Sequence, residues 1–94
     1  PDKPVYISVD VKHDNTHFFI TNKDSFDYKN AELEINGTYN LKWGSLNAGE
    51  TYRISHNQFT DRHGNRFNYF SMKPKEFSII CDLENGKKGF ALQQ

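Results

Sequence analysis

Two segments of the chain alternate apolar and polar residues with a period of two, and this pattern constrains the fold more than any other feature. The first runs from Val5 to Lys12 and the second from Phe77 to Leu83. Such alternation places every second side chain on one face of an extended strand, whereas an amphipathic helix needs apolar residues three or four apart. Both segments therefore predict β-strands with one face in a core.

Five further segments show strand character and are bounded by Gly, Asn or Asp. They cover residues 17–21, 31–35 and 51–55, a segment from Tyr39 to Trp43, and a last one around Phe90 and Leu92. About seven short strands and no useful amphipathic helix predict an all-β fold, an immunoglobulin-like or fibronectin type III-like antiparallel β-sandwich. A length of 94 residues fits one such domain, covering residues 1–94.

Turn composition predicts how the strands pair. Asp14 and Asn15 separate the first two strands, which we expect to form an antiparallel hairpin. At Asn36-Gly37, a two-residue loop would place the apolar rows of the flanking strands on opposite faces. We therefore expect a loop with an odd number of residues, which pairs Ile35 with Tyr39, Leu33 with Leu41 and Ala31 with Trp43, or a strand that crosses to the other sheet.

The last hairpin gives a simpler expectation. Asn85-Gly86 is a sequence typical of a two-residue type I′ turn. Such a turn pairs Cys81 with Phe90 and Ile79 with Leu92, so that all four side chains share the core face.

Residues 56–75 lack any apolar periodicity. A connection of this length without structure is unusual in a small domain, so we expect part of it to form a helical turn or a short strand. Ser55 is a candidate cap for such a turn, and the segment from Asp61 to Asn65 is typical of a tight turn.

Charge and composition exclude several classes of partner. Twelve basic and twelve acidic residues cancel, and no basic cluster predicts binding to nucleic acid. The longest apolar run, Phe18 to Ile20, is far too short to cross a bilayer, so we expect no membrane insertion by this domain. The sequence begins with Pro1 and has no apolar leader, which suggests a domain excised from a longer protein.

Three segments in the first three-fifths of the chain carry a resemblance to known domains: Ile20–Asp24, Tyr28–Ile35 and Leu46–Tyr52. An I-x-N strand, an alternating strand and an L-x-x-G-E turn in this order resemble bacterial immunoglobulin-like accessory domains of the CARDB and FxLYD kinds. The immunoglobulin disulfide is absent, because Cys81 is the only cysteine, so the kinship is architectural.

The second half, from Asn57–Asp61 through Arg66–Asn68 to Lys73–Ser78, looks like small bacterial proteins of unassigned function with an N-terminal membrane anchor. The two resemblances imply an extracytoplasmic domain of the cell envelope or a secreted protein, held near a membrane by a segment outside this sequence. They supply no catalytic residues.

Candidate binding residues lie in the irregular connection. Tyr69 and Phe70 stand beside Arg66 and Lys73, and we expect these four residues to form the binding surface if the domain has one. Loop-to-core packing is the alternative for both aromatic side chains. Trp43, Tyr39 and Tyr52 would extend the group to an exposed aromatic platform, although the odd loop places Trp43 and Tyr39 on the core row.

The residues most often found in catalytic and metal sites do not form a recognisable pattern. His56 and His63 within one connection are the most plausible metal ligands, but His commonly serves as an ordinary half-buried or surface residue. Cys81 lies on an inward strand face, where a thiol acts as a small apolar filler. We expect Asp24, Asp27, Asp61 and Asn65 to be solvated turn residues, because they lack the EF-hand spacing. The alternative is that their side-chain oxygens bind calcium.

The sequence thus predicts no metal site, no cofactor and no enzyme activity. We expect a non-catalytic accessory binding or spacer domain whose protein or glycan partner the sequence leaves open. The alternative is a carbohydrate-binding module that uses exposed aromatic side chains. An enzyme is a more distant alternative, because no acid–base pair with a third orienting residue can be assembled from the sequence.

Overall fold

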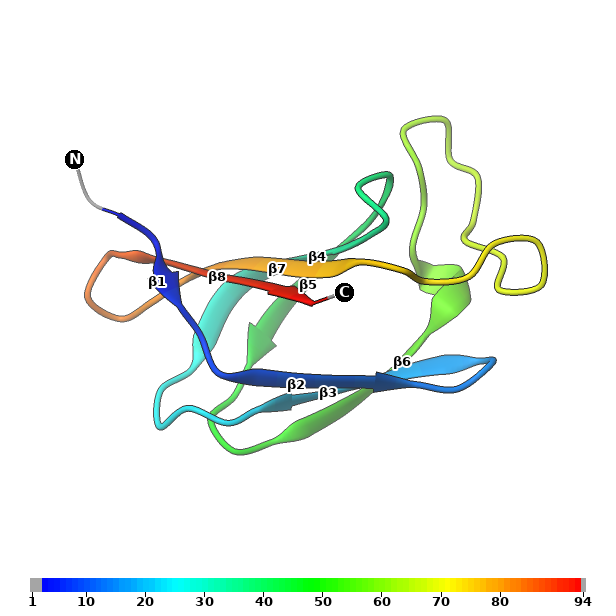
Figure 1. Cartoon of the computed structure of the whole chain (residues 1–94). Helices are drawn as coiled ribbons and strands as arrows, with labels where there is room; N and C mark the ends of the chain where they lie inside the picture. Colours follow the sequence, from blue (N-terminus) through cyan, green and yellow to red (C-terminus); the bar gives the residue numbers. More distant parts are fainter. Residues whose placement is uncertain (1–2, 94) are drawn as a thin grey trace.

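The computed structural model describes residues 3–93 and is an all-β sandwich of two sheets packed face to face (Figure 1). The predicted all-β sandwich is confirmed. The larger sheet has the order β1 (Val5–Tyr6), β8 (Lys88–Gln93), β7 (Phe77–Asp82), β4 (Tyr28–Ile35) and β5 (Tyr39–Leu46). The smaller sheet has the order β2 (Val9–His13), β3 (His17–Asn22) and β6 (Thr51–Ser55), and a 3-10 turn, η1 (His56–Gln58), follows β6.

The first predicted strand is divided between the two sheets. β1 pairs in parallel with β8, whereas β2 pairs with β3 in the expected antiparallel hairpin. The chain changes sheets at Ile7 and Ser8, where the Ile7 amide donates to the Phe90 carbonyl (3.0 Å) and the Ser8 amide donates to Asp24 (2.8 Å). Ile7 and Val9 both remain buried during the crossing. The division explains why the sandwich has eight strands rather than seven.

The β4–β5 hairpin has the predicted odd loop. Ile35 faces Tyr39, and Leu33 faces Leu41 further along the pair. A bulge then shifts the register by one, so Ala31 faces Gly44 rather than the predicted Trp43.

β4 also begins earlier than predicted, at Tyr28. This side chain is fully buried, and its hydroxyl group donates to Asp24 (2.6 Å), which satisfies the one polar atom that burial removes from water.

The predicted register of the last hairpin is wrong by one residue. Cys81 faces Gly89, and Ile80 faces Phe90. The Leu83 amide donates to the Lys87 carbonyl (2.9 Å), so the loop holds three residues, and Gly86 adopts a positive φ of 79°. Three-residue hairpin loops with glycine in the left-handed region are a common alternative to the two-residue turn. One extra loop residue moves every later side chain to the opposite face.

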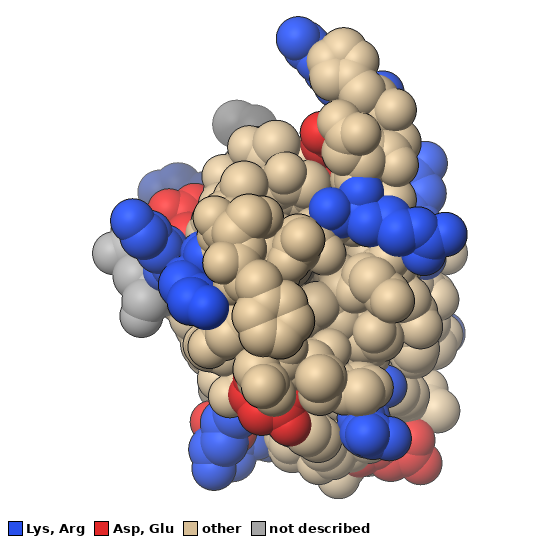
Figure 2. Space-filling model, turned by 90° about the vertical axis from the view of Figure 1, so that its right-hand side faces the viewer, with Lys and Arg blue, Asp and Glu red and all other residues tan. Residues whose placement is uncertain are grey.

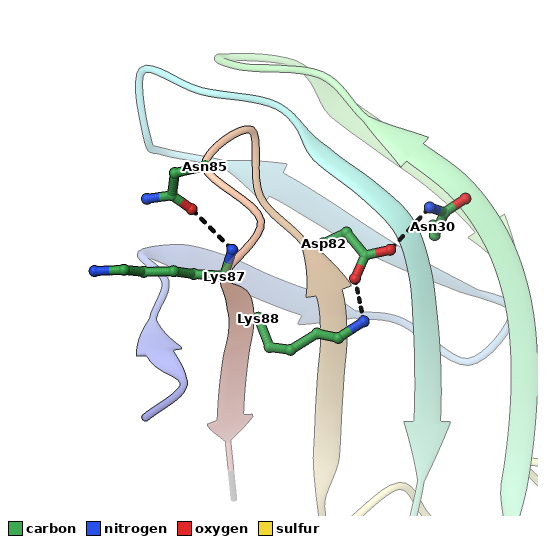
Figure 3. Close-up of polar contacts among 5 residues, drawn as sticks. All are labelled: Asn30, Asp82, Asn85, Lys87 and Lys88. Carbon is green, nitrogen blue, oxygen red and sulfur yellow. Dashed lines mark hydrogen bonds and ion pairs between the residues drawn. The ribbon is translucent and has the colours of Figure 1, made fainter. Parts of the chain in front are cut away.

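As a result, Phe90 and Leu92 point away from the core. Together with Tyr6 and Ile80 they form an apolar patch on the outer face of the larger sheet, where Tyr6 is 78% and Ile80 50% exposed. The rings of Tyr6 and Phe90 meet edge to face, with their centroids 6.0 Å apart. We call these four residues the outer patch. At one end of the same face, Asp82 binds Lys88 and Asn30 (Figure 3).

The core lies between the sheets and is rich in aromatic and branched side chains. Gly89 allows close packing there, since a Cβ at this position would lie 2.8 Å from the Cys81 sulfur. Burial raises the pKa of the Cys81 thiol to about 11, so the thiol stays protonated and acts as the predicted apolar filler.

Candidate functional site

The long connection between β6 and β7 folds over one end of the sandwich and forms a hollow of about 390 Å³. Three of the four predicted binding residues, Arg66, Tyr69 and Phe70, line it together. Figure 2 shows this end as a largely uncharged surface with Lys and Arg side chains on both sides. The lining comprises Asn15, Thr16, Ser55, His56, Asn57, Arg66, Phe67, Asn68, Tyr69 and Phe70.

The first half of the connection, residues 59–67, folds back on itself. Phe59 and Phe67 are both buried, and the Phe67 amide donates to the Phe59 carbonyl (2.9 Å). Between them, the Asp61 carboxylate accepts hydrogen bonds from the amides of His63 and Asn65, both at 2.9 Å, in the predicted turn. The buried rings of Phe59 and Phe67 and this turn give the segment the local structure expected for so long a connection.

The second half, residues 68–73, is organised by Asn68. Its side-chain oxygen accepts from the Phe70 amide (2.9 Å), and its carbonyl accepts from the Met72 amide (3.0 Å). An asparagine that bonds the amide two residues ahead is a standard means of closing a tight turn. The turn presents Tyr69 and Phe70 at the mouth of the hollow.

Asn36, in the β4–β5 loop, fixes the end of this connection to the sandwich. Its side-chain oxygen accepts from the amides of Lys75 (2.8 Å) and Glu76 (3.0 Å), and its amide nitrogen donates to the Lys73 carbonyl (3.0 Å). One side chain thus binds three backbone groups of a segment almost forty residues away.

Tyr69 and Lys73 interact with each other. The Lys73 ammonium lies 3.8 Å from the centroid of the Tyr69 ring and donates to the Tyr69 carbonyl (2.9 Å). The Tyr69 ring also stacks on His56, with centroids 5.3 Å apart. Lys73 does not line the hollow, and Tyr69 is already engaged. Phe70, which is 80% exposed, is therefore the ring that is free to meet a ligand.

His56 lies beneath this surface and is only 4% exposed. Its ring packs against Phe18, with centroids 4.6 Å apart, and against Tyr69 and Phe67. Neither ring nitrogen makes a hydrogen bond of normal geometry to the residues that the structure describes, although the His17 backbone lies near enough to oppose part of the effect of burial on the ring. Burial lowers the pKa of His56, so the ring is neutral at physiological pH. Nothing in the sequence pattern indicated that this histidine is buried.

Three polar side chains of the hollow, Asn57, Asn68 and Arg66, leave hydrogen-bond donors free. The Asn57 side-chain oxygen accepts from the Ser55 hydroxyl (2.8 Å), just as the Asn68 oxygen is bound within its own turn. Arg66 uses one guanidinium nitrogen to bind the Asn57 carbonyl (3.1 Å). Within residues 3–93, no Asp or Glu lines the hollow. Ser55 occupies the predicted cap position before η1, but its hydroxyl binds Asn57 rather than the backbone.

The other candidate residues are dispersed. His63 lies exposed in the turn of residues 61–65, whereas His56 is buried, and the described part of the chain holds no group of three metal-ligating side chains. Trp43, Tyr39 and Tyr52 do not extend the exposed surface at Phe70, because all three are partly buried against the core. The Trp43 ring also contacts Tyr52, and Tyr39 packs on Phe67.

The comparisons add no relative. The chain matches no protein-family model, no curated protein and no solved structure. The described residues also include no helix that is long and apolar enough to span a membrane.

Proposed function

We propose that the chain is a non-catalytic accessory binding domain of an extracytoplasmic bacterial protein, and that it binds its ligand at the hollow between η1 and β7. The observation that carries the proposal is the meeting of Arg66, Tyr69 and Phe70 at one concave site. Loops held by a rigid sandwich are where binding residues usually lie. The hydrogen bonds of Asn36 and Asn68 hold this loop in place, which lowers the entropy cost of binding.

The immunoglobulin-like type belongs to the same proposal. The orders β2-β3-β6 and β8-β7-β4 correspond to strands A-B-E and G-F-C of immunoglobulin domains, and β5 takes the position next to C that variable-type domains fill with an added strand. The extracytoplasmic location and the accessory role rest on the resemblance of the sequence to CARDB and FxLYD domains.

A carbohydrate ligand is the more specific candidate. Phe70 exposes its ring next to a hollow rich in amide groups, which combines a flat apolar surface for a sugar ring with hydrogen-bonding groups for its substituents. A spacer without a ligand would not require a largely exposed aromatic side chain at this position.

A titration followed by amide chemical shifts tests the proposal, with a glycan panel, zinc and calcium as probes. We expect saturable shifts confined to the segments around Asn57 and residues 66–70. Phe70→Ala should abolish them. Tyr6→Ala, which removes an equally exposed aromatic ring on the outer patch, should leave them unchanged. Shifts centred on Tyr6 and Ile80 would instead assign binding to the outer patch and contradict the proposed site.

A further inference from the structure

Asn57, Asn68 and Arg66 each leave hydrogen-bond donors free for a ligand, whereas Asn15, Thr16, Ser55 and Tyr69 supply oxygens that can also accept. The side-chain oxygens of Asn57 and Asn68 are bound locally, so their NH₂ groups are the parts left for a ligand, and no described residue accepts a hydrogen bond from either. Arg66 adds a guanidinium group with only one of its nitrogens engaged. A neutral sugar offers hydroxyl groups that both donate and accept, whereas a carboxylate only accepts.

Charge points in the same direction. Arg66 is the only formally charged residue in the lining, since His56 is neutral and no described carboxylate faces the hollow. The Lys73 ammonium lies nearby over the Tyr69 ring. A guanidinium group binds a carboxylate through two parallel hydrogen bonds, and such charge-assisted bonds are about twice as strong as neutral ones. Arg66 therefore gives the lining a positive charge for an anion, while the nearby Asp14 carboxylate is bound by the Thr16 amide and hydroxyl group.

The shape of the site selects among anions. Phe70 is 80% exposed beside a hollow of about 390 Å³, which falls in the size range of small-molecule sites and exceeds the volume that a lone carboxylate fills. An exposed aromatic face is suited to the apolar face of a pyranose ring.

We propose that the hollow binds an acidic saccharide, a chain containing hexuronate residues. The uronate carboxylate binds Arg66, the NH₂ groups of Asn57 and Asn68 donate to the carboxylate and ring substituents, and the sugar ring packs on Phe70. This inference rests on the proposed function, because it names the ligand class of the same site.

The experiment is an amide-shift titration of the intact domain with three probes: trigalacturonate, neutral galactotriose and hexaglutamate. We expect trigalacturonate to shift the resonances of Arg66, Asn68 and Phe70, with an affinity at least tenfold higher than that of galactotriose. The affinity should fall as salt is added. Hexaglutamate, which presents carboxylates without a sugar ring, should bind at least tenfold more weakly than trigalacturonate.

Two arginine variants make the test specific. Arg66→Gln should reduce trigalacturonate affinity at least tenfold, whereas Arg62→Gln, in the exposed turn outside the lining, should not change it. A native amide spectrum checks that each variant folds. If Arg66→Gln unfolds, Asn68→Ser, which retains the oxygen acceptor but not the NH₂ group, provides the same comparison.

The outcomes separate this inference from the proposed function. Equal affinity for galactotriose and trigalacturonate overturns the acidic preference but leaves the hollow as a saccharide site. Equal affinity for hexaglutamate overturns the saccharide and leaves an acidic peptide as the ligand. No shift with any of the three probes overturns the inference, and the proposed function fails as well only if the wider glycan and ion panel also leaves residues 66–70 unshifted.

Discussion

Replacing His56 by phenylalanine should stabilise the domain, although the side chain is almost fully buried. The ring packs among Phe18, Phe67 and Tyr69, and its two nitrogens make no hydrogen bond of normal geometry within residues 3–93. A buried polar group without a hydrogen bond costs about 1–3 kcal/mol. Phenylalanine keeps the aromatic packing and removes this cost, while its larger ring adds about 1 kcal/mol of crowding. We expect a net gain of up to about 2 kcal/mol in the free energy of unfolding at pH 7.5.

The pH dependence has a definite sign. Because burial lowers the pKa of His56 in the folded state, the unfolded chain binds a proton at this residue more readily than the folded chain does. The contribution of His56 to the free energy of unfolding is therefore fully present above the pKa of about 6.5 that the residue has in the unfolded chain. It is lost as the pH falls toward the lower pKa of the folded state, by at most about 1.4 kcal/mol per pH unit. His56→Phe removes this loss, so its advantage over the wild type should grow between pH 7.5 and pH 5.5.

Urea unfolding followed by the fluorescence of Trp43, the only tryptophan, measures both effects. His63→Phe is the matched control, because His63 is exposed in a turn, and it should change the midpoint little at pH 7.5. A lower midpoint for His56→Phe at pH 7.5 would refute the reasoning, since it would mean that the ring nitrogens make bonds that stabilise the fold. An equal gain in stability for His56→Phe at pH 7.5 and pH 5.5 would also refute the reasoning.

Three further predictions test the packing and the register. Gly89→Ala places a Cβ 2.8 Å from the Cys81 sulfur, so it should lower the urea midpoint and cost about 1–3 kcal/mol of stability. Adding Cys81→Ala to this variant should recover part of the lost stability. An unchanged midpoint for Gly89→Ala would contradict the close packing. Asn36→Gly removes three hydrogen bonds, and glycine tolerates the φ of 55° at this position. Hydrogen exchange of the Lys75 and Glu76 amides should therefore accelerate. Unchanged exchange would show that other contacts hold the end of the connection. In the same unfolding assay, Phe90→Ser should lower the free energy of unfolding by only about 1 kcal/mol, whereas Ile79→Ala should lower it by about 2–5 kcal/mol. The reverse order would support the register expected from the sequence.

Sequence reasoning succeeded where local turn chemistry and apolar alternation pointed to the same pairing. The hairpin between β2 and β3 and the odd loop between Ile35 and Tyr39 both follow from these two sources. The prediction failed at Asn85-Gly86, because this dipeptide fits both a two-residue and a three-residue loop. The apolar residues Phe90 and Leu92 favoured the two-residue loop, whereas the structure has the three-residue loop. The sequence contains no information that these two side chains would be accommodated on an exposed face.

The division of the first strand was also beyond prediction. Val5, Ile7, Val9 and Val11 form one unbroken alternating row, and all of them pack on the core. Where the chain changes sheet, the Ser8 amide donates to Asp24, which is sixteen residues away. Such a long-range contact leaves no trace in a periodic pattern.

The candidate site was predictable in part. Arg66, Tyr69 and Phe70 were identified as aromatic and basic neighbours in an irregular segment, and the structure brings them to one hollow. Lys73 lies beside Tyr69, as expected, but it packs on that ring and does not line the hollow. Asn57 and Asn68 were missed, because isolated asparagines in a connection resemble ordinary turn residues.

The parallel pairing of β1 with β8 has a mechanical consequence. The first and last strands of the domain lie side by side and run in the same direction, joined by the bond from the Ile7 amide to the Phe90 carbonyl. Tension applied to the chain before β1 and after β8 would therefore slide the two strands past each other, which loads their hydrogen bonds in shear. Bonds loaded in shear break together rather than one after another. We therefore expect the sandwich to resist extension as a unit.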